Sequence, residues 1–384
     1  MLDLSQEVAG PFCGKLLAGL GAEVVKVEPP GSGDPSRSVG PFVRAEPHPE
    51  QSAPFLYLNT GKKSITLNFD SATGAALLQS LAREFDILVE SFPPGHLDRR
   101  GLGYAALARL NPRLIYTSIT PFGQTGPYRD YTGSDLVAQA VGALMQTIGL
   151  PAREPLKIGG DVALYTTGMS AFSATMLALY VRDAEGYGQQ VDVSAMESIT
   201  VAQIHSSIQH QFGRVPTRRE SPLVRARDGW VSPGLERGER EDTWPRVCAL
   251  IGRPELAEDP AFKTREARRE HQQALLAILS AWAATHAKEE IYHTLQELRS
   301  VAGYVATVED LLASGQLSAR AFFQPLDHPD AGPALYPGAP FRLQGEAWQQ
   351  TRAPRLGEHN AEVYGSDLGL SREELGRLRG LGVI

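Results

Sequence analysis

Three basic residues beside glycine-containing loops are the side chains in this sequence best suited to bind a charged ligand. Arg37 follows a loop with two glycines, Lys63 stands two residues after a glycine, and Arg99 stands two residues before one. Glycine lets backbone amides approach a ligand closely, and arginine and lysine pair with phosphate oxygens. One such group alone is typical of a surface turn. Three of them in one segment indicate a ligand that carries phosphates.

A further loop, 121–128, follows an apolar stretch and contains Gly123 and Gly126. Such a loop could place backbone N–H groups near a substrate oxygen, and it could equally be an ordinary turn. No dinucleotide fingerprint, nucleophile elbow or metal motif accompanies it. His205 and His210 stand five residues apart and would lie on different faces of a helix, so we expect no metal site there.

Composition narrows the class of protein. The chain has 384 residues, a formal net charge of −7 and 42% hydrophobic residues. This length allows two domains, and the negative charge argues against a nucleic-acid partner. We see no long uncharged apolar run and no secretory signal, so we predict no membrane partner and a cytoplasmic location. Two distant cysteines, Cys13 and Cys248, predict neither a disulfide framework nor a zinc site. We expect no metal and no tightly bound cofactor.

The elements that must position these loops alternate between strands and helices. The predicted strands are 21–28, 64–69, 86–90, 114–119 and 189–194, and the predicted helices are 71–84, 135–148 and 164–182. This alternation predicts an α/β fold with a parallel sheet covered on both faces. A basic, loop-like segment near 215–227 indicates the start of a second domain. We therefore predict a large domain at 1–215 and 323–384 and a small domain at 216–322.

These segments also form one ordered series. In chain order it contains Leu2-Asp3-Leu4, Ala9-Gly10-Pro11-Phe12, Gly21 to Glu28, Gly33-Asp34-Pro35-Ser36-Arg37, Leu58 to Leu67, Leu97 to Gly103, Asn111 to Tyr116, Phe122 to Pro127 and Ala353 to Asn360. The series resembles the family III coenzyme A (CoA) transferases, the carnitine/bile-acid-inducible group, across nearly the whole chain.

The resemblance implies a fold and an activity. The fold would be a Rossmann-like large α/β domain built from both chain ends, with a smaller α+β domain between them. Two such chains would interlock like links into a dimer. The activity would be transfer of CoA between an acyl-CoA and a carboxylic acid, with the CoA thioester bound as substrate.

The resemblance also assigns residues to the CoA site. They are Val8, Ala9, Arg37, Leu58, Lys63, Phe92, Arg99 and Gly123. By position, the three basic residues would face the CoA phosphates and the adenine end, and residues 8 and 9 would line the approach to the thioester. The family often has Asn-Phe-Arg-Pro-Gly where this chain has Ser-Phe-Pro-Pro-Gly at 91–95, which removes an amide and a cation.

One expected carboxylate is missing. In this family an aspartate stands four residues before a helix glycine, after a Pro-x-x-x-Gly segment. Its carboxylate attacks the thioester carbonyl, forms a mixed anhydride and releases the CoA thiolate. In this chain the segment is 155–159 and the helix glycine is Gly168, so the position falls on Leu164. Leucine cannot act as a nucleophile or base. The nearest carboxylate is Asp161, three residues earlier.

Three interpretations follow. The chain is a carboxylate-free subunit that needs an aspartate-bearing homologue, or an active transferase that uses Asp161, or a CoA-thioester-binding protein without turnover. The oligomer is accordingly a homodimer or a heteromer. Related acyl-CoA racemases use a histidine where Ser134 stands, so racemase activity is less expected. The acyl donor and acceptor stay open, because fold alone does not give them.

Overall fold

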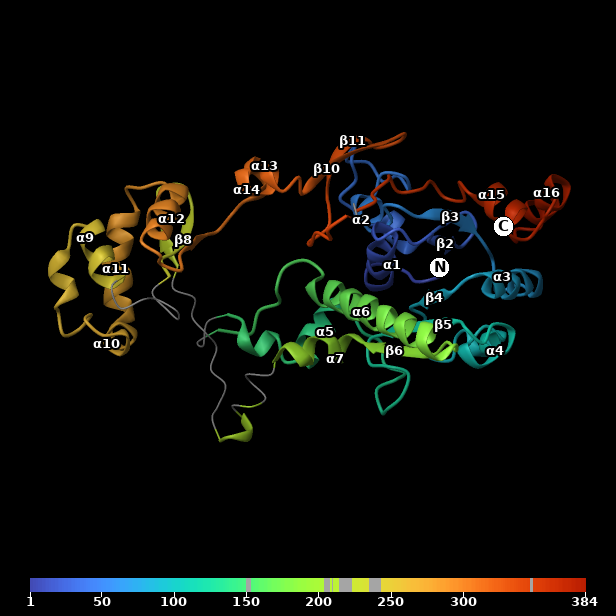
Figure 1. Cartoon of the computed structure of the whole chain (residues 1–384), viewed down its shortest axis with the longest axis horizontal. Helices are drawn as coiled ribbons and strands as arrows, with labels where there is room; N and C mark the ends of the chain where they lie inside the picture. The colour runs from blue at the N-terminus through green and yellow to red at the C-terminus, as the bar shows by residue number, and fades with distance from the viewer. Residues whose placement is uncertain (150–152, 204–207, 209, 214–222, 235–242, 346–347) are drawn as a thin grey trace. The chain divides into compact units, whose positions relative to one another are not determined.

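The computed structural model describes residues 1–149, 153–203, 208, 210–213, 223–234, 243–345 and 348–384. The chain divides into two compact units (Figure 1). Unit 1 comprises Met1–Arg218 with Arg320–Ile384, and unit 2 comprises Arg219–Ala319. The chain therefore leaves the first unit once and returns to it, with both of its ends in the same unit.

Unit 1 is built on a six-stranded parallel sheet with the strand order β3-β2-β1-β4-β5-β6. In chain order the strands are β1 Leu2–Asp3, β2 Val25–Glu28, β3 Lys63–Thr66, β4 Ile87–Glu90, β5 Ile115–Thr120 and β6 Gln190–Ser194. This is the doubly wound, Rossmann-like order. The order reverses between β1 and β4, and ligands bind such sheets outside the carboxyl ends of the strands at that point.

Helices cover both faces of this sheet. They are α1 Ala9–Gly19, α2 Ala53–Leu58, α3 Ala72–Glu84, α4 Tyr104–Leu110, α5 Asp135–Val141, α6 Val162–Glu185, α7 Ala195–Thr200, α15 Asn360–Ser366 and α16 Arg372–Gly380. Alternate strand residues face opposite sides. Leu88 packs with residues of α3, α4, α15 and α16, whereas Ile87 and Val89 pack with residues of α1 and α6. Because α15 and α16 share a core with α3, the C-terminal segment covers one face of the sheet that the N-terminal segment forms.

The remaining strands and helices form a hairpin in unit 1 and the whole of the described part of unit 2. Unit 1 also contains the hairpin of β10 Phe323–His328 and β11 Gly332–Pro337. Unit 2 pairs β7 Val224–Arg225, β8 Trp230–Ser232 and β9 Gly303–Tyr304 antiparallel. Its helices are α9 Thr243–Leu250, α10 Arg265–Glu270, α11 Gln272–Ala283, α12 Lys288–Glu297, α13 Val308–Ala313 and α14 Gly315–Ala319. One apolar cluster that includes Trp244, Leu279 and Ile291 forms the core of this α+β unit.

The predicted helices differ from the observed ones at their ends. The stretch 135–148 is not one helix, because α5 stops at Val141 and a 3-10 turn, Met145–Thr147, follows. Ala143 between them has a φ of 64°, a left-handed conformation that a continuous helix does not contain. The stretch 164–182 is longer than expected and forms α6, which places residue 164 in its first turn.

Helix α6 is the long green helix of Figure 1. By length and composition alone it could cross a membrane, whereas the sequence predicts no membrane-spanning segment. It packs against α1, β5 and β6, and Ala171 and Ala178 lie in the core of unit 1. Core helices of soluble proteins pass the same test. Its other face exposes apolar side chains, namely Met169, Met176, Leu177 and Tyr180.

Candidate functional site

Buried ion pairs hold together the loops that follow β1 and β2. The Lys62 ammonium lies 2.7 Å from Asp3 Oδ2, and the Lys26 ammonium lies 2.7 Å from Asp34 Oδ2. Burial by itself would raise the pKa of Asp3, but the nearby Lys62 and Lys26 outweigh it and lower that pKa. Lys26 also donates to the Ser5 carbonyl. The pairs therefore fix the backbone that leads from β1 into α1.

Val8 and Ala9 lie at the start of α1, on the carboxyl side of β1. Val8 is the N-cap residue of α1 and offers no side-chain acceptor to the first turn. Glu7 before it has a φ of 64°, which is unusual for a non-glycine residue, and its backbone N–H donates to Asp34 Oδ1. Asp34 thus anchors the strained residue directly before the predicted approach to the thioester.

Arg37 is completely buried, and all of its donors are used within the chain. Its guanidinium donates to both carboxylate oxygens of Glu28, to Glu50, and to the carbonyls of Pro49 and Pro354. It also stacks 3.6 Å from the centroid of the Phe55 ring. Arginine has five N–H donors, so none is left for a ligand in this arrangement. The CoA-phosphate role of Arg37 stays a prediction.

The other two predicted cations lie at opposite edges of the sheet. Lys63 is the first residue of β3, at the amino edge, and pairs with Glu23 and Glu362. Arg99 follows β4, at the carboxyl edge, in the 3-10 turn Asp98–Arg100. Among the described residues no carboxylate pairs with Arg99, and its side chain is exposed. Of the three cations, Arg99 is therefore the one best placed to meet a phosphate.

Phe92 also follows β4 at the carboxyl edge. Its ring stacks on His96 with centroids 4.8 Å apart and meets Phe69 edge to face. Its backbone N–H donates to Glu90 Oε2 over 2.8 Å. Glu90 is buried at the end of β4, and burial raises its pKa to about 7 although the Phe92 and Ser118 hydrogen bonds oppose the shift. A carboxyl group with a raised pKa therefore accepts a hydrogen bond from the backbone of Phe92, one of the predicted CoA residues.

Gly123 lies in the loop after β5 and has a φ of 89°. This conformation would be strained for any residue with a side chain. Its backbone N–H donates to Thr120 Oγ1, and the next N–H, of Gln124, donates to the carboxylate of Asp192 on β6. Neither amide points at an open oxygen site here. Leu58, the last residue of α2, is buried. It contributes packing rather than a polar contact.

The carboxylate of Asp135 fixes the first turn of α6, which contains Leu164. Its Oδ1 accepts from the backbone N–H groups of Ala163 and Leu164 over 2.8 and 3.3 Å. Its Oδ2 accepts from Gln139 and pairs with Lys157 over 2.9 Å. Asp135 directly follows Ser134, and no role for its carboxylate was predicted from the sequence. The only feature of the sequence that could have drawn attention to Asp135 is its position as the first residue of the predicted helix 135–148.

A glycine sets the spacing between α6 and α1. A Cβ at Gly168 would lie 2.5 Å from the carbonyl oxygen of Ala9, so only glycine permits this approach. The half-buried Leu164, one turn earlier on α6, packs against the apolar cluster that contains Ala9 and Cys13. The structure therefore brings Leu164, the predicted position of the family's carboxylate, into the same apolar cluster as Ala9.

Asp161 is the residue directly before α6. It is exposed, and its side chain does not cap the helix. Within the described residues its carboxylate has no hydrogen bond or ion pair. It lies at the same end of α6 as Leu164, but on the exposed loop that leads into the helix.

A lysine that sequence reasoning missed lies beside this site. Lys15 on α1 is 3% exposed, and its ammonium donates to Thr60 Oγ1 over 2.7 Å. It lies 4.3 Å from the centroid of the Tyr57 ring. Burial, with a smaller contribution from Lys62, lowers the pKa of Lys15 to about 7. In the sequence its only signal is a charged residue inside the apolar stretch of α1.

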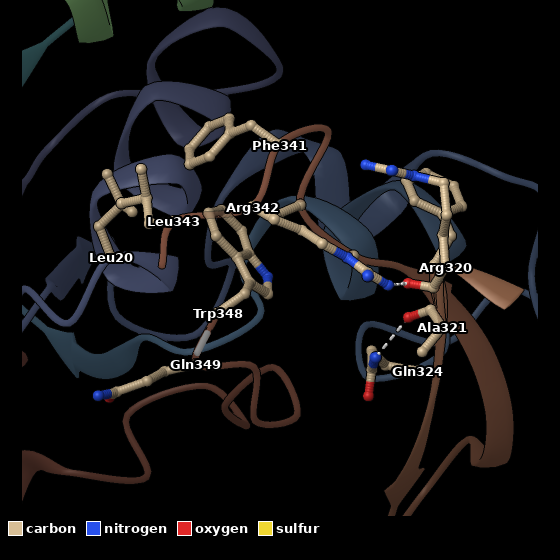
Figure 2. Close-up of a pocket in the computed structure, with 12 residues that line it drawn as sticks. Leu20, Arg320, Ala321, Gln324, Phe341, Arg342, Leu343, Trp348 and Gln349 are labelled. Carbon is tan, nitrogen blue, oxygen red and sulfur yellow. Dashed lines mark hydrogen bonds between the residues drawn. The ribbon is translucent and has the colours of Figure 1, made fainter. Parts of the chain in front are cut away.

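A pocket of about 500 Å³ opens elsewhere in unit 1 (Figure 2). Its lining includes Leu20, directly after the last residue of α1, together with Arg320, Phe341, Arg342 and Trp348. Figure 2 shows the Arg342 guanidinium hydrogen-bonded to the carbonyl of Arg320. The pocket contains none of the predicted CoA residues and lies at the opposite end of α1 from Val8. Within the described residues no group of three or more potential metal ligands occurs.

The doubly wound parallel sheet with helices on both faces defines an α/β protein of the Rossmann-like class, and residues 1–360 match the model of CoA-transferase family III. The chain belongs to this family of enzymes.

The relatives of the chain are named CoA-transferases. Succinyl-CoA–D-citramalate CoA-transferase of Chloroflexus aurantiacus is 33% identical over all of this chain and 96% of its own length. Succinyl-CoA:(R)-benzylsuccinate CoA-transferase subunit BbsE of Thauera aromatica is 32% identical over 94% of this chain and 92% of its own length. The crystal structure of a CaiB/BaiF family protein from Brucella suis superimposes with a TM-score of 0.85 at 32% identity, covering 95% of this chain and 97% of the other.

Proposed function

We propose that this chain supplies the thioester-binding cleft of a family III CoA-transferase and depends on an aspartate-bearing homologue for the reactive carboxylate. Leu164 carries the proposal. It stands in the first turn of α6, at the position that the resemblance assigns to the family's nucleophile, and it packs in the apolar cluster that contains Ala9. A hydrocarbon side chain there cannot attack a thioester carbonyl.

Asp135 and Asp161, the two carboxylates at this end of α6, differ in their hydrogen bonding. Asp135 is fully used by two backbone N–H groups, Gln139 and Lys157, so it acts as a helix anchor and has no oxygen free for attack. One relative, BbsE, is named as a subunit, which supports an assembly of unlike chains. In such an assembly the partner's carboxylate would form the mixed anhydride with the acyl group and release the CoA thiolate.

The exposed state of Asp161 supports a second candidate function. Its carboxylate has no partner among the described residues and lies at the same end of α6. An active transferase that uses Asp161 would need that loop to fold back over the first turn of the helix.

The exposed apolar face of α6 supports association with a second family member. Met169, Leu177 and Tyr180 are each more than half exposed on one side of the helix. Large apolar side chains gathered in this way are typical of surfaces that a partner covers. We propose that a second chain, identical or homologous, covers this face in an interlocked dimer in the cytoplasm.

Trapping of the acyl intermediate tests the proposal. The purified chain is incubated with an acyl-CoA and then with hydroxylamine, and modified carboxylates are located by peptide mass spectrometry. We expect no modified carboxylate in the natural chain and modification of residue 164 in Leu164→Asp. Modification of Asp161 in the natural chain would support the second candidate and overturn the partner-dependent one. The matched control is Leu164→Asn, which has the size of aspartate without its nucleophile.

A further inference from the structure

The pocket of about 500 Å³ in unit 1 combines arginines with aromatic rings (Figure 2). Its lining includes Arg320 and Arg342, the rings of Phe341 and Trp348, and the aliphatic side chain of Leu20. Among the described residues no aspartate or glutamate lines it, although the whole chain has a formal net charge of −7. Small-molecule pockets are typically about 300–1,000 Å³ in volume, with an apolar lining and a few polar groups. This lining therefore suits a small anion with an apolar body.

The two arginines of the pocket have no carboxylate partner inside the chain. Arg342 donates to the backbone carbonyl of Arg320, and neither guanidinium forms an ion pair in the part of the chain that the structure describes. A guanidinium has five N–H donors, so most of those of Arg342 are left for a ligand. Like charges that line one pocket repel each other, and a bound anion would replace this repulsion with attraction.

The aromatic wall of the pocket is held in place by the end of α1. Trp348 Nε1 donates to Gln350 Oε1 over 3.0 Å, and the backbone N–H of Gln349 donates to the carbonyl of Gly19 over 2.9 Å. A Cβ at Gly19 would lie 2.2 Å from the indole ring, so a side chain at this position would displace the tryptophan. The Phe341 ring meets the indole edge to face, with centroids 6.2 Å apart. The two rings therefore form one fixed apolar surface.

This combination favours an aromatic ring that carries a carboxylate on a short arm. A guanidinium binds a carboxylate through two parallel hydrogen bonds and also stacks on ring faces. Aromatic walls pack best against another ring, either offset or edge to face. The ligand would not share the predicted thioester site, because the 11 residues of α1, about 16 Å of helix, lie between Val8 and the pocket.

We propose that this pocket is a second ligand site of the chain, which binds a small aromatic carboxylic acid as a free anion. Arg342, with Arg320 beside it, binds the carboxylate, and Trp348 and Phe341 pack against the ring. No bond is made or broken there, and the acid is neither the acyl group nor its acceptor. The inference does not depend on the proposed function, because none of the predicted CoA residues lines the pocket.

Three probes test the charge and the ring separately. Indole-3-acetate has both features, indole-3-acetamide lacks the charge, and 3-cyclohexylpropionate lacks the aromatic ring. Their affinities for the full-length chain are measured by isothermal titration calorimetry, with and without saturating CoA. We expect indole-3-acetate to bind more tightly than the amide by about 10- to 100-fold, the range of a hydrogen bond to a charged group, and more tightly than the saturated acid. CoA should leave its affinity unchanged.

Two variants locate the binding. Arg342→Met should remove most of the preference for the acid over the amide. Trp348→Leu should weaken both indole ligands alike, by about 3- to 10-fold, and keep that preference. The matched control is Arg109→Met, which removes an exposed arginine from the last turn of α4, outside the pocket, and should bind as the natural chain does. Arg342 is itself exposed, so its variant is expected to fold, and an unchanged melting temperature verifies this.

The other outcomes overturn the inference. Binding of indole-3-acetate that Arg342→Met leaves unchanged would place the acid elsewhere, and displacement by CoA would assign it to the thioester site. Absence of binding would refute the site. If the natural chain then also dimerises in sedimentation and Arg342→Met does not, a second copy of the chain fills the pocket instead of a small acid.

Discussion

Glu90 should make the stability of unit 1 depend on pH, and Glu90→Gln should remove that dependence. Burial raises the pKa of Glu90 from 4.5 to about 7 in the folded chain. Between these two pH values the folded state binds more protons than the unfolded state, so the free energy of unfolding falls as pH rises. At about 1.4 kcal/mol for each pKa unit, the loss over this window is about 3 kcal/mol.

The variant removes the charge and keeps an acceptor for the backbone N–H of Phe92, which now donates to Glu90 Oε2. We therefore expect Glu90→Gln and the natural chain to differ little at pH 5, and the variant to be more stable at pH 8 by about 2–3 kcal/mol. Hydrogen-bond changes at Ser118 would alter both ends of the profile alike.

Urea unfolding followed by circular dichroism at pH 5, 6, 7 and 8 measures this difference. The control is Glu84→Gln, because Glu84 is exposed at the end of α3 in the same unit. Its profile should parallel that of the natural chain. Parallel profiles for the natural chain and Glu90→Gln would refute the reasoning, since they would show that Glu90 is not protonated by burial.

Two further substitutions test the packing of the site. Arg37→Met leaves Glu28 buried without its cation, so urea unfolding should show a loss of about 3–5 kcal/mol, and a loss below 1 kcal/mol would contradict the buried pairing. Gly168→Ala places a Cβ 2.5 Å from the Ala9 carbonyl oxygen, so it should lower both the melting temperature and the affinity for a CoA thioester. The control is Gly376→Ala, which meets open space on α16 and should stabilise the chain by up to about 1 kcal/mol.

Local sequence patterns were enough to predict the architecture. Apolar runs such as 86–90 and 114–119 became β4 and β5, and the apolar stretch that begins at 164 became part of α6. These patterns are readable because strand and helix periods depend on neighbours in the chain. The break after Val141 was missed, because the left-handed Ala143 leaves no signature in the residue types around it.

The ordered motifs likewise established the family, which the match over residues 1–360 confirms. They also predict, from the spacing between Pro155 and Gly168, that Leu164 takes the place of the family's aspartate, and that assignment stays a prediction. The roles assigned to individual CoA-site residues stay predictions, including those of Val8, Ala9 and Arg99.

Only the tertiary structure decided which charges have partners. Arg37 and Lys15 look alike in sequence as cations near predicted ligand loops or helices. In the fold Arg37 meets Glu28, Glu50 and the distant carbonyl of Pro354, whereas Lys15 meets a threonine and an aromatic ring. Ion pairs form between side chains that are far apart in the chain, and the energy of a buried charge depends on everything packed around it. That environment exists only after folding, so residue types and spacing cannot show it.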